Sequence, residues 1–118
     1  MAVAAISISG VLATSAAADA AVTPTKVTIK GQNGDFNGAV KSTDEGNCAN
    51  DRKVILYKLT GDSPDPSEDR KIASDTAGPS GDKYVWSTGN TGEKNGKFYA
   101  RVKKTQFCGG DTSDVIRS

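Results

Sequence analysis

The most informative absence in this chain of 118 residues is histidine, of which there is none. Without histidine, the Ser-His-Asp and Cys-His nucleophilic systems and the usual catalytic zinc site are excluded. The 14 acidic residues leave hydrolysis by paired carboxylates formally open. Nearly all of them lie in turns rich in Gly, Pro and Ser, where nothing apolar would raise a carboxyl pKa. We therefore expect neither an enzymatic activity nor a cofactor.

Net charge is also nearly absent. Lys and Arg total 15 against 14 Asp and Glu, and the formal charge of +1 gives no long-range field to attract a polyanion. Nucleic acid is therefore not an expected partner. A strongly apolar run of about 20 residues, the length that a membrane span needs, is missing as well. No membrane span is expected in the mature chain.

The N-terminal segment has the pattern of an export leader, although it lacks the usual basic residues at its start. Residues 3–13 form a moderately apolar run, and Ala18-Asp19-Ala20 has the Ala-x-Ala spacing that a signal peptidase accommodates. We interpret residues 1–20 as a signal peptide and residues 21–118 as one domain, secreted or held at the cell surface. An alanine-rich disordered tail or a buried helix is the alternative.

The rest of the chain has the pattern of an all-β protein. Short clusters of β-branched and aromatic residues alternate with Gly, Asn, Asp and Pro, as in an antiparallel sandwich or barrel. The run 53–59 is apolar on both faces, which is typical of a strand in the middle of a sheet. We predict a sandwich of about seven strands, at residues 26–30, 36–42, 53–59, 71–76, 84–87, 98–103 and 113–117. The segments 43–51, 61–69, 77–82 and 90–96 are predicted as loops or turns.

The two cysteines, Cys48 and Cys108, are predicted to form a disulfide. Two cysteines in an exported chain are more often paired than free, and a reactive thiol would need a histidine or a CxxC neighbour that this chain lacks. If the strands run alternately up and down, the connections that hold the two cysteines lie at the same end of the sandwich. Closing this loop would restrict the unfolded chain by about 4 kcal/mol.

The loop at residues 61–69 is a candidate calcium site, because calcium takes several oxygen ligands from a flexible segment. Its carboxylates are those of Asp62, Asp65, Glu68 and Asp69. Their spacing does not match an EF-hand, and two prolines limit how they could converge. A solvated loop is the favoured interpretation, and no metal is predicted.

Aromatic side chains are few, and most are needed for the core. Four rings with a polar atom are candidates for stacking on sugars: Tyr57, Tyr84, Trp86 and Tyr99. Alternation along residues 98–103 places Phe98 and Ala100 inward and Tyr99 in solvent, so Tyr99, together with Tyr57, is the best candidate for a ligand-facing ring. Arg101, Lys103 and Lys104 form a small basic edge, interpreted as a guard against pairing with another sheet.

A succession of short motifs also resembles a known group of proteins. The motifs are Phe36-x-Gly38-x-Val40-x-Ser42, Arg52-Lys53-Val54-x-Leu56-Tyr57, Ile72-x-Ser74-Asp75-Thr76 and Gly96-x-Phe98-Tyr99-Ala100-x-Val102, with Cys48, Trp86, Cys108 and Ser113 between and after them. Together they resemble secreted bacterial β-sandwich modules of the transthyretin-like, carboxypeptidase-regulatory-like and Cna-B-like group, of the kind found in actinobacterial proteins. The resemblance implies an immunoglobulin-like or transthyretin-like sandwich at the cell surface. It brings no catalytic residues with it.

Two functions stay open from the sequence. The leading interpretation is a secreted, non-catalytic structural or protein-interaction module at the bacterial surface or exterior, with an extracellular protein or glycan as its partner. The alternative is a small carbohydrate-binding or cell-wall-binding module. Two or more aromatic rings exposed on one flat face would favour the alternative.

Overall fold

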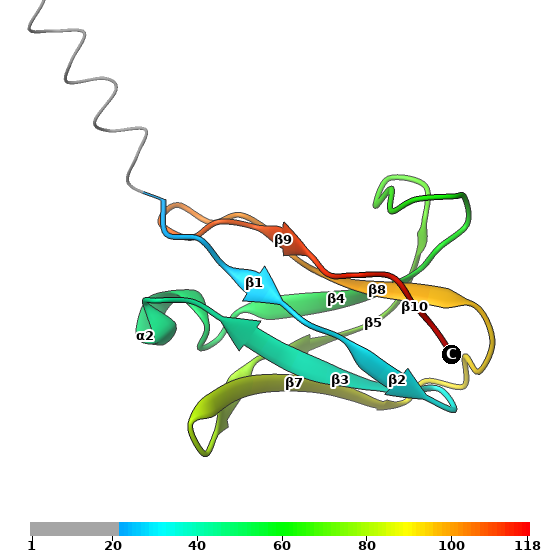
Figure 1. Ribbon diagram of the computed structural model, residues 1–118, viewed down its shortest axis with the longest axis horizontal. Coiled ribbons are helices and arrows are strands. Elements are labelled where there is room, and N and C mark those ends of the chain that lie inside the picture. The colour runs from blue at the N-terminus through cyan, green and yellow to red at the C-terminus, as the bar shows by residue number, and fades with distance from the viewer. Residues whose placement is uncertain (1–21) are drawn as a thin grey trace, which may run out of the picture.

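The computed structural model describes residues 22–118, which form two antiparallel sheets packed against each other (Figure 1). The predicted leader, residues 1–20, lies outside the described residues. The first sheet contains β1 (Lys26–Val27), β2 (Lys30–Gln32), β3 (Asp35–Lys41), β6 (Gly78–Ser80) and β7 (Lys83–Asn90). The second sheet contains β4 (Lys53–Lys58), β5 (Arg70–Thr76), β8 (Lys97–Val102), β9 (Asp111–Thr112) and β10 (Ile116–Arg117).

The strand order is β1-β3-β7-β6 in the first sheet, with β2 also paired to β3, and β10-β8-β4-β5 in the second, with β9 also paired to β8. These two sheets confirm the predicted all-β antiparallel sandwich. The apolar strand β4 lies between β5 and β8, as its sequence predicted. The chain crosses from one sheet to the other after β3, after β5 and after β7, so each sheet combines two segments that are distant in the sequence.

The core lies between the sheets and follows the two-residue period of the strands. Its members include Phe36, Val40, Trp86, Val54, Leu56, Phe98, Ala100 and Val102. The rings of Phe36 and Phe98 meet across the two sheets with their centroids 4.6 Å apart. Gly38 makes room for Trp86, whose Nε1 donates to the Thr28 carbonyl at 3.0 Å, because a Cβ at this position would collide with both groups. The only tryptophan of the chain is thus a core residue.

Several element boundaries differ from the prediction. Residues 26–30 divide into β1 and the start of β2; of the predicted last strand, 113–117, only β10 is formed, and β9 lies just before it. Between β9 and β10 the Ala100 N–H of β8 donates to the Ser113 hydroxyl, at 2.8 Å, so a side chain takes the place of a backbone carbonyl there. The predicted turn at 77–82 contains the short edge strand β6, where Pro79 needs no N–H for the ladder. A single helical turn, α2 (Glu45–Cys48), lies in the predicted loop 43–51.

The disulfide between Cys48 and Cys108 is confirmed, with the two Cα atoms 5.4 Å apart. Cys48 ends α2 in the connection from β3 to β4, and Cys108 lies in the connection from β8 to β9. The bond therefore ties the crossover between the sheets to the β8–β9 connection of the second sheet, at the end of the sandwich here called the cysteine end.

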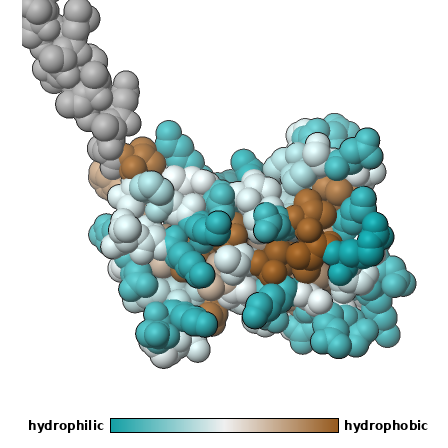
Figure 2. Space-filling model, viewed as in Figure 1, coloured by the Kyte–Doolittle hydropathy of each residue, from teal (hydrophilic) through white to brown (hydrophobic). Residues whose placement is uncertain are grey.

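The open seam between the sheets carries part of the apolar surface. In the view of Figure 2 this surface forms a patch within a mainly hydrophilic face. A hollow of ≈ 180 Å³ in the seam is lined by Val27, Ile29 and Ile116, among others. The Val27 N–H donates to Asp111 Oδ2 across it at 2.8 Å. Core side chains therefore line this open seam, and a hydrogen bond between the sheets bridges it.

Candidate functional site

Arg52 organises the cysteine end from within. Its guanidinium group, 5% exposed, donates to the carbonyls of Cys48, Lys103 and Gly109 and to the Thr25 hydroxyl, at 2.6–3.1 Å. Burial lowers the pKa of this guanidinium from its ordinary value. Since the acceptors belong to the segments that carry both cysteines, Arg52 fixes the same connections as the disulfide. Its role is structural.

The expected solvent-facing position of Tyr99 is wrong. Tyr99 and Tyr57 do point away from the main core, but they are 0% and 1% exposed. Their rings stack with centroids 5.2 Å apart and form a second small cluster with Ile55 and Leu59 on the outer face of the second sheet. A side chain on the outer face of a sheet can be covered by a loop, which alternation along the strand does not reveal. Neither ring is available for stacking on a sugar.

The loop at residues 61–69 is held to this tyrosine cluster by Asp69. The Tyr99 hydroxyl donates to Asp69 Oδ2 at 2.5 Å, and the N–H groups of Thr60 and Asp65 donate to the same carboxylate. Burial would raise the pKa of Asp69, but these bonds and one from the Thr60 hydroxyl outweigh it and lower the pKa to about 2. Burial and the bond to Asp69 together raise the pKa of Tyr99. The ionised carboxylate of Asp69 thus holds the loop against the sheet. We call this set of hydrogen bonds to Asp69 the latch.

The other carboxylates of the calcium candidate do not join Asp69. Asp65 accepts from the N–H and hydroxyl of Ser67, and both Asp69 oxygens are occupied by the loop and Tyr99. Within residues 22–118 there is no group of three or more His, Cys, Asp or Glu side chains that could hold a metal ion. Asp62, Asp65 and Glu68 lie exposed on the loop.

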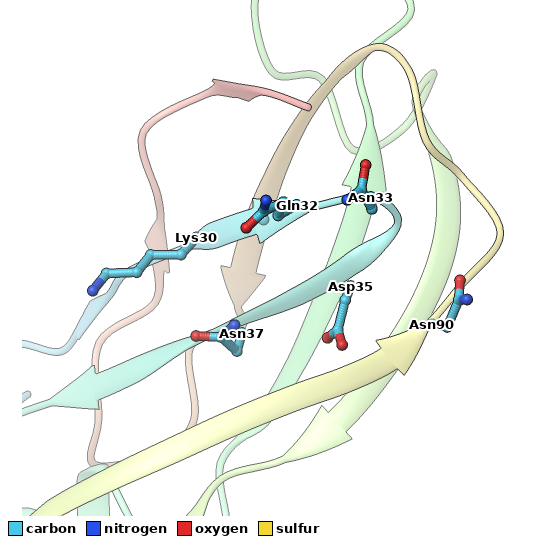
Figure 3. A pocket seen from close by; sticks show the side chains of 7 residues that line it. Lys30, Gln32, Asn33, Asp35, Asn37 and Asn90 are labelled. Atoms are coloured by element: carbon cyan, nitrogen blue, oxygen red, sulfur yellow. The ribbon is translucent and has the colours of Figure 1, made fainter.

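A polar hollow lies at the end of the first sheet, around the hairpin that joins β2 to β3 (Figure 3). It has a volume of ≈ 560 Å³ and is lined by Lys30, Gly31, Gln32, Asn33, Asp35, Asn37 and Asn90. Lys30 pairs with Asn37 and Gln32 with Asp35 across the hairpin, so their side chains share one face. The hollow presents amide, carboxylate and ammonium groups, and its lining includes no aromatic ring. This hollow could not be predicted from the sequence, because it forms only when β2, β3 and β7 are paired.

A cationic surface covers the other half of the face that bears the tyrosine cluster. Ile55 lies at its centre, Lys53 precedes Ile55 by two residues on β4, and Arg101 pairs with Ile55 from β8. Lys53, Lys71, Lys103 and Lys104 line one hollow of ≈ 330 Å³, together with Ile55, Asp51, Arg52 and Thr105. We call Lys53, Lys71, Arg101, Lys103 and Lys104 the cationic face.

The cationic face is not the edge guard that the sequence suggested. Arg101 lies on β8, which pairs with β4 through Ile55 and with β9 through Thr112. A strand with partners on both sides needs no protection against edge pairing. The basic residues of this segment therefore project from a paired strand and the connection that follows it, and the interpretation as a guard is wrong for Arg101.

At several positions of the two sheets, cations oppose cations. The register sets Lys26 against Lys41, Lys58 against Arg70 and Lys97 against Arg117. On the cationic face, Lys103 follows Val102, which pairs with Val54, so Lys103 lies across from Lys53. Like charges directly opposite each other destabilise a sheet. These pairs therefore carry an electrostatic cost unless an anion lies between them.

One of these pairs is neutralised within the chain. Glu93 Oε1 lies 3.2 Å from Lys58 Nζ and 2.7 Å from Arg70 Nη2. The hydrogen bond from Lys58 is the largest of the effects that lower the pKa of Glu93. Within residues 22–118 there is no other ion pair between side chains closer than 4.0 Å. The cationic face thus has no carboxylate in that range.

A comparison with known proteins found no match: no family model, curated protein or solved structure is similar to this chain. Among the described residues, none of the helical segments has the length and apolar character required to cross a bilayer.

Proposed function

We propose that this chain is an exported, non-catalytic interaction module, and that it binds its partner through the cationic face. On this proposal it belongs with the secreted bacterial β-sandwich modules that its motifs resemble. A disulfide in a small β domain is compatible with an extracellular location. The leader pattern at residues 1–20 supports the same location.

The observation that carries the proposal is the unneutralised charge of the cationic face. Its lysines are exposed and lie on or beside paired strands, so the sheet holds the bases of their side chains in fixed positions. An acidic partner would remove the repulsion between Lys53 and Lys103, which the chain itself does not neutralise. Complementary charge raises the rate at which two partners associate, and it orients them at the interface.

The titratable groups support a non-catalytic role. A carboxylic acid that serves as a general acid needs a raised pKa. The two carboxylates with a changed pKa, Asp69 and Glu93, are both shifted downward and are both engaged by neighbouring donors. They are therefore suited to holding segments together and not to transferring protons.

Sedimentation with envelope material of the producing cell tests this proposal. We expect the purified chain to pellet with envelopes at low ionic strength and to be released by salt, because exposed ion pairs are screened. Lys53→Gln with Lys103→Gln should abolish most of the pelleting. The matched control is Lys26→Gln with Lys41→Gln, which removes the same charge from the opposite sheet. Equal retention of all three proteins would contradict the proposal.

A carbohydrate-binding function is the second candidate, and the polar hollow of Figure 3 is the observation that favours it. Asn, Gln and Asp side chains can donate and accept in the paired way that sugar hydroxyls require. Retardation of the chain in gels that contain a neutral polysaccharide, lost in Asn37→Ala, would support this function. Asn47→Ala, at the cysteine end, is the control. Migration that no neutral polysaccharide changes would rule this candidate out.

A further inference from the structure

The cationic face has features that restrict the chemistry of its ligand, and the inference below rests on the proposed function. Strand β4 presents two cation pairs, Lys58 with Arg70 and Lys53 with Lys103. At the first pair, one carboxylate oxygen of Glu93 contacts both cations. At the second pair two cations likewise lie across from each other, here on β4 and on the segment after β8, with Arg101 two residues before Lys103. A guanidinium group beside two ammonium groups is suited to carboxylates.

The shape of the surface argues for an extended ligand. The cations that line the hollow come from β4, β5 and the segment after β8. Neighbouring strands are about 4.8 Å apart, so the bases of these side chains span roughly 10 Å across the sheet. A single small carboxylate would contact only part of this set. A polymer with a carboxylate on each repeating unit could contact several cations at once.

The surroundings argue for a polysaccharide and against a polypeptide or nucleic acid. Protein interfaces are anchored by aromatic or apolar side chains that fill pockets, and strand addition needs a free sheet edge. Apart from the polar side chains of Asp51, Arg52 and Thr105, the lining of this hollow provides the largely buried Ile55 and the aliphatic parts of lysine side chains, on the face of paired strands. Tyr57 and Tyr99 are covered, and the lining of the hollow contains no ring on which a base could stack; the exposed Phe107 of the same connection is not part of that lining.

The conformational entropy of the ligand points the same way. Ordering a flexible acidic peptide costs free energy for every residue that is fixed. A chain of pyranose rings is stiffer and loses less entropy when it lies along a flat surface. We infer that the cationic face binds a linear, carboxylate-bearing polysaccharide, with Lys53, Lys71, Arg101 and Lys103 as the contacting residues.

Titration calorimetry with polygalacturonate, free of divalent cations and at low salt, tests this inference on the purified chain. We expect binding that weakens as salt is added. Lys53→Gln with Lys103→Gln should weaken it about tenfold, since each exposed ion pair contributes modestly. Lys26→Gln with Lys41→Gln, on the other sheet, should bind like the parent protein. Lys71→Gln with Arg101→Gln is a second variant of the same face and should show the same loss.

Each other outcome overturns the inference. No binding to polygalacturonate, equal loss in the Lys26/Lys41 control, or equal binding of dextran would contradict it. Binding of polyglutamate or of inorganic polyphosphate with equal or higher affinity would assign the face to acidic peptides or to phosphate polymers instead. A chain that pellets with envelopes but ignores polygalacturonate would leave the proposed function standing and remove this inference alone. Circular dichroism of each variant confirms that it is folded.

Discussion

At its C-terminal end, strand β4 sets Lys58 against Arg70, and at its N-terminal end Lys53 lies across from Lys103. Glu93, from the connection between β7 and β8, lies between the first two cations. No carboxylate of residues 22–118 comes within 4 Å of the second pair. The register of a sheet can thus create charge repulsion. In this sheet a loop neutralises the repulsion at one end of β4 and leaves it at the other. Where it is left, the repulsion marks a surface that an external anion would stabilise.

The two ends also differ in what covers the sheet. Toward Lys58 the loop at residues 61–69 is latched over Tyr57 and Tyr99 by Asp69. Toward Lys53 the outer face is open, while the disulfide and Arg52 hold the connections that border it. The cationic face therefore ends where the loop at residues 61–69 covers the sheet.

Loss of the disulfide has the largest expected effect and acts on the open end. The bond closes a sequence separation of 60 residues, and its removal should lower the free energy of unfolding by about 4 kcal/mol. Each kcal/mol lowers the melting temperature of such a domain by roughly 4–8 °C. Cys48→Ser, Cys108→Ser and the double variant should lose nearly the same amount in thermal melts, because one bond is lost in every case. Melting temperatures that reduction leaves unchanged would contradict this prediction.

Replacement of Arg52 should have the next largest effect, at the same end. Arg52→Met removes the donor for the Cys48, Lys103 and Gly109 carbonyls and should cost about 2–3 kcal/mol in chemical denaturation, because buried acceptors lose a charged partner. Lys104→Met is the control, since its side chain is exposed and should change stability little. Equal losses in the two variants would show that the Arg52 bonds do not hold this end.

The latch at the covered end should contribute less. Tyr99→Phe removes the hydroxyl that donates to Asp69 and should cost about 1–2 kcal/mol at neutral pH. The folded pKa of Asp69 is lowered from 3.8 to about 2. The stabilisation by its ionised form is therefore complete above the unfolded pKa and is lost as the pH falls through about 2. The difference between the two proteins, measured by denaturation at several pH values, should shrink between these values.

Tyr84→Phe is the control for that experiment, because the Tyr84 hydroxyl makes no such bond to a carboxylate. A stability difference for Tyr99→Phe that stays constant from neutral pH down to pH 2 would contradict the latch. Faster proteolysis within residues 61–69 of Tyr99→Phe would locate the loss at the loop.

Much of the fold could be predicted from the sequence because local chemistry determines it. The apolar run at 53–59 indicated a central strand, and two cysteines without an activating neighbour indicated a disulfide. Strand limits were less predictable where a side chain replaces a backbone partner, as Ser113 does for Ala100. The prediction that Tyr99 faces solvent was wrong for a related reason. Alternation along a strand indicates the face of the sheet on which a side chain lies, but a distant loop decides whether that face is exposed to solvent.

The candidate site could not be predicted, because it depends on register. Lys53 and Lys103 lie about half the domain apart in the sequence, and only the pairing of Val54 with Val102 brings them together. The net charge of +1 gave no indication of the cationic face, since most acidic residues lie in loops while lysines project from the strands. The net charge does not reveal a charged surface when positively and negatively charged side chains lie on different parts of the molecule.

The smallest effects give the sharpest test of the two ends of β4, because they should have opposite signs. Glu93→Gln should lower stability at neutral pH, since it removes the shared partner of Lys58 and Arg70. Lys53→Gln should raise stability by about 0.3 kcal/mol, because it removes one member of an unneutralised pair. Differential scanning calorimetry at low ionic strength measures both changes.

Salt provides the control for this last pair of variants. Screening weakens attraction and repulsion alike, so both changes should decrease as the ionic strength rises. Acid should remove the Glu93 effect as well: its folded pKa is lowered, so its contribution is complete above the unfolded pKa and is lost as the pH falls. The Lys53 effect should persist in acid, where lysine stays charged. If Lys53→Gln were instead destabilising, the repulsion between Lys53 and Lys103 would be absent, and the main argument for an anion on the cationic face would fail.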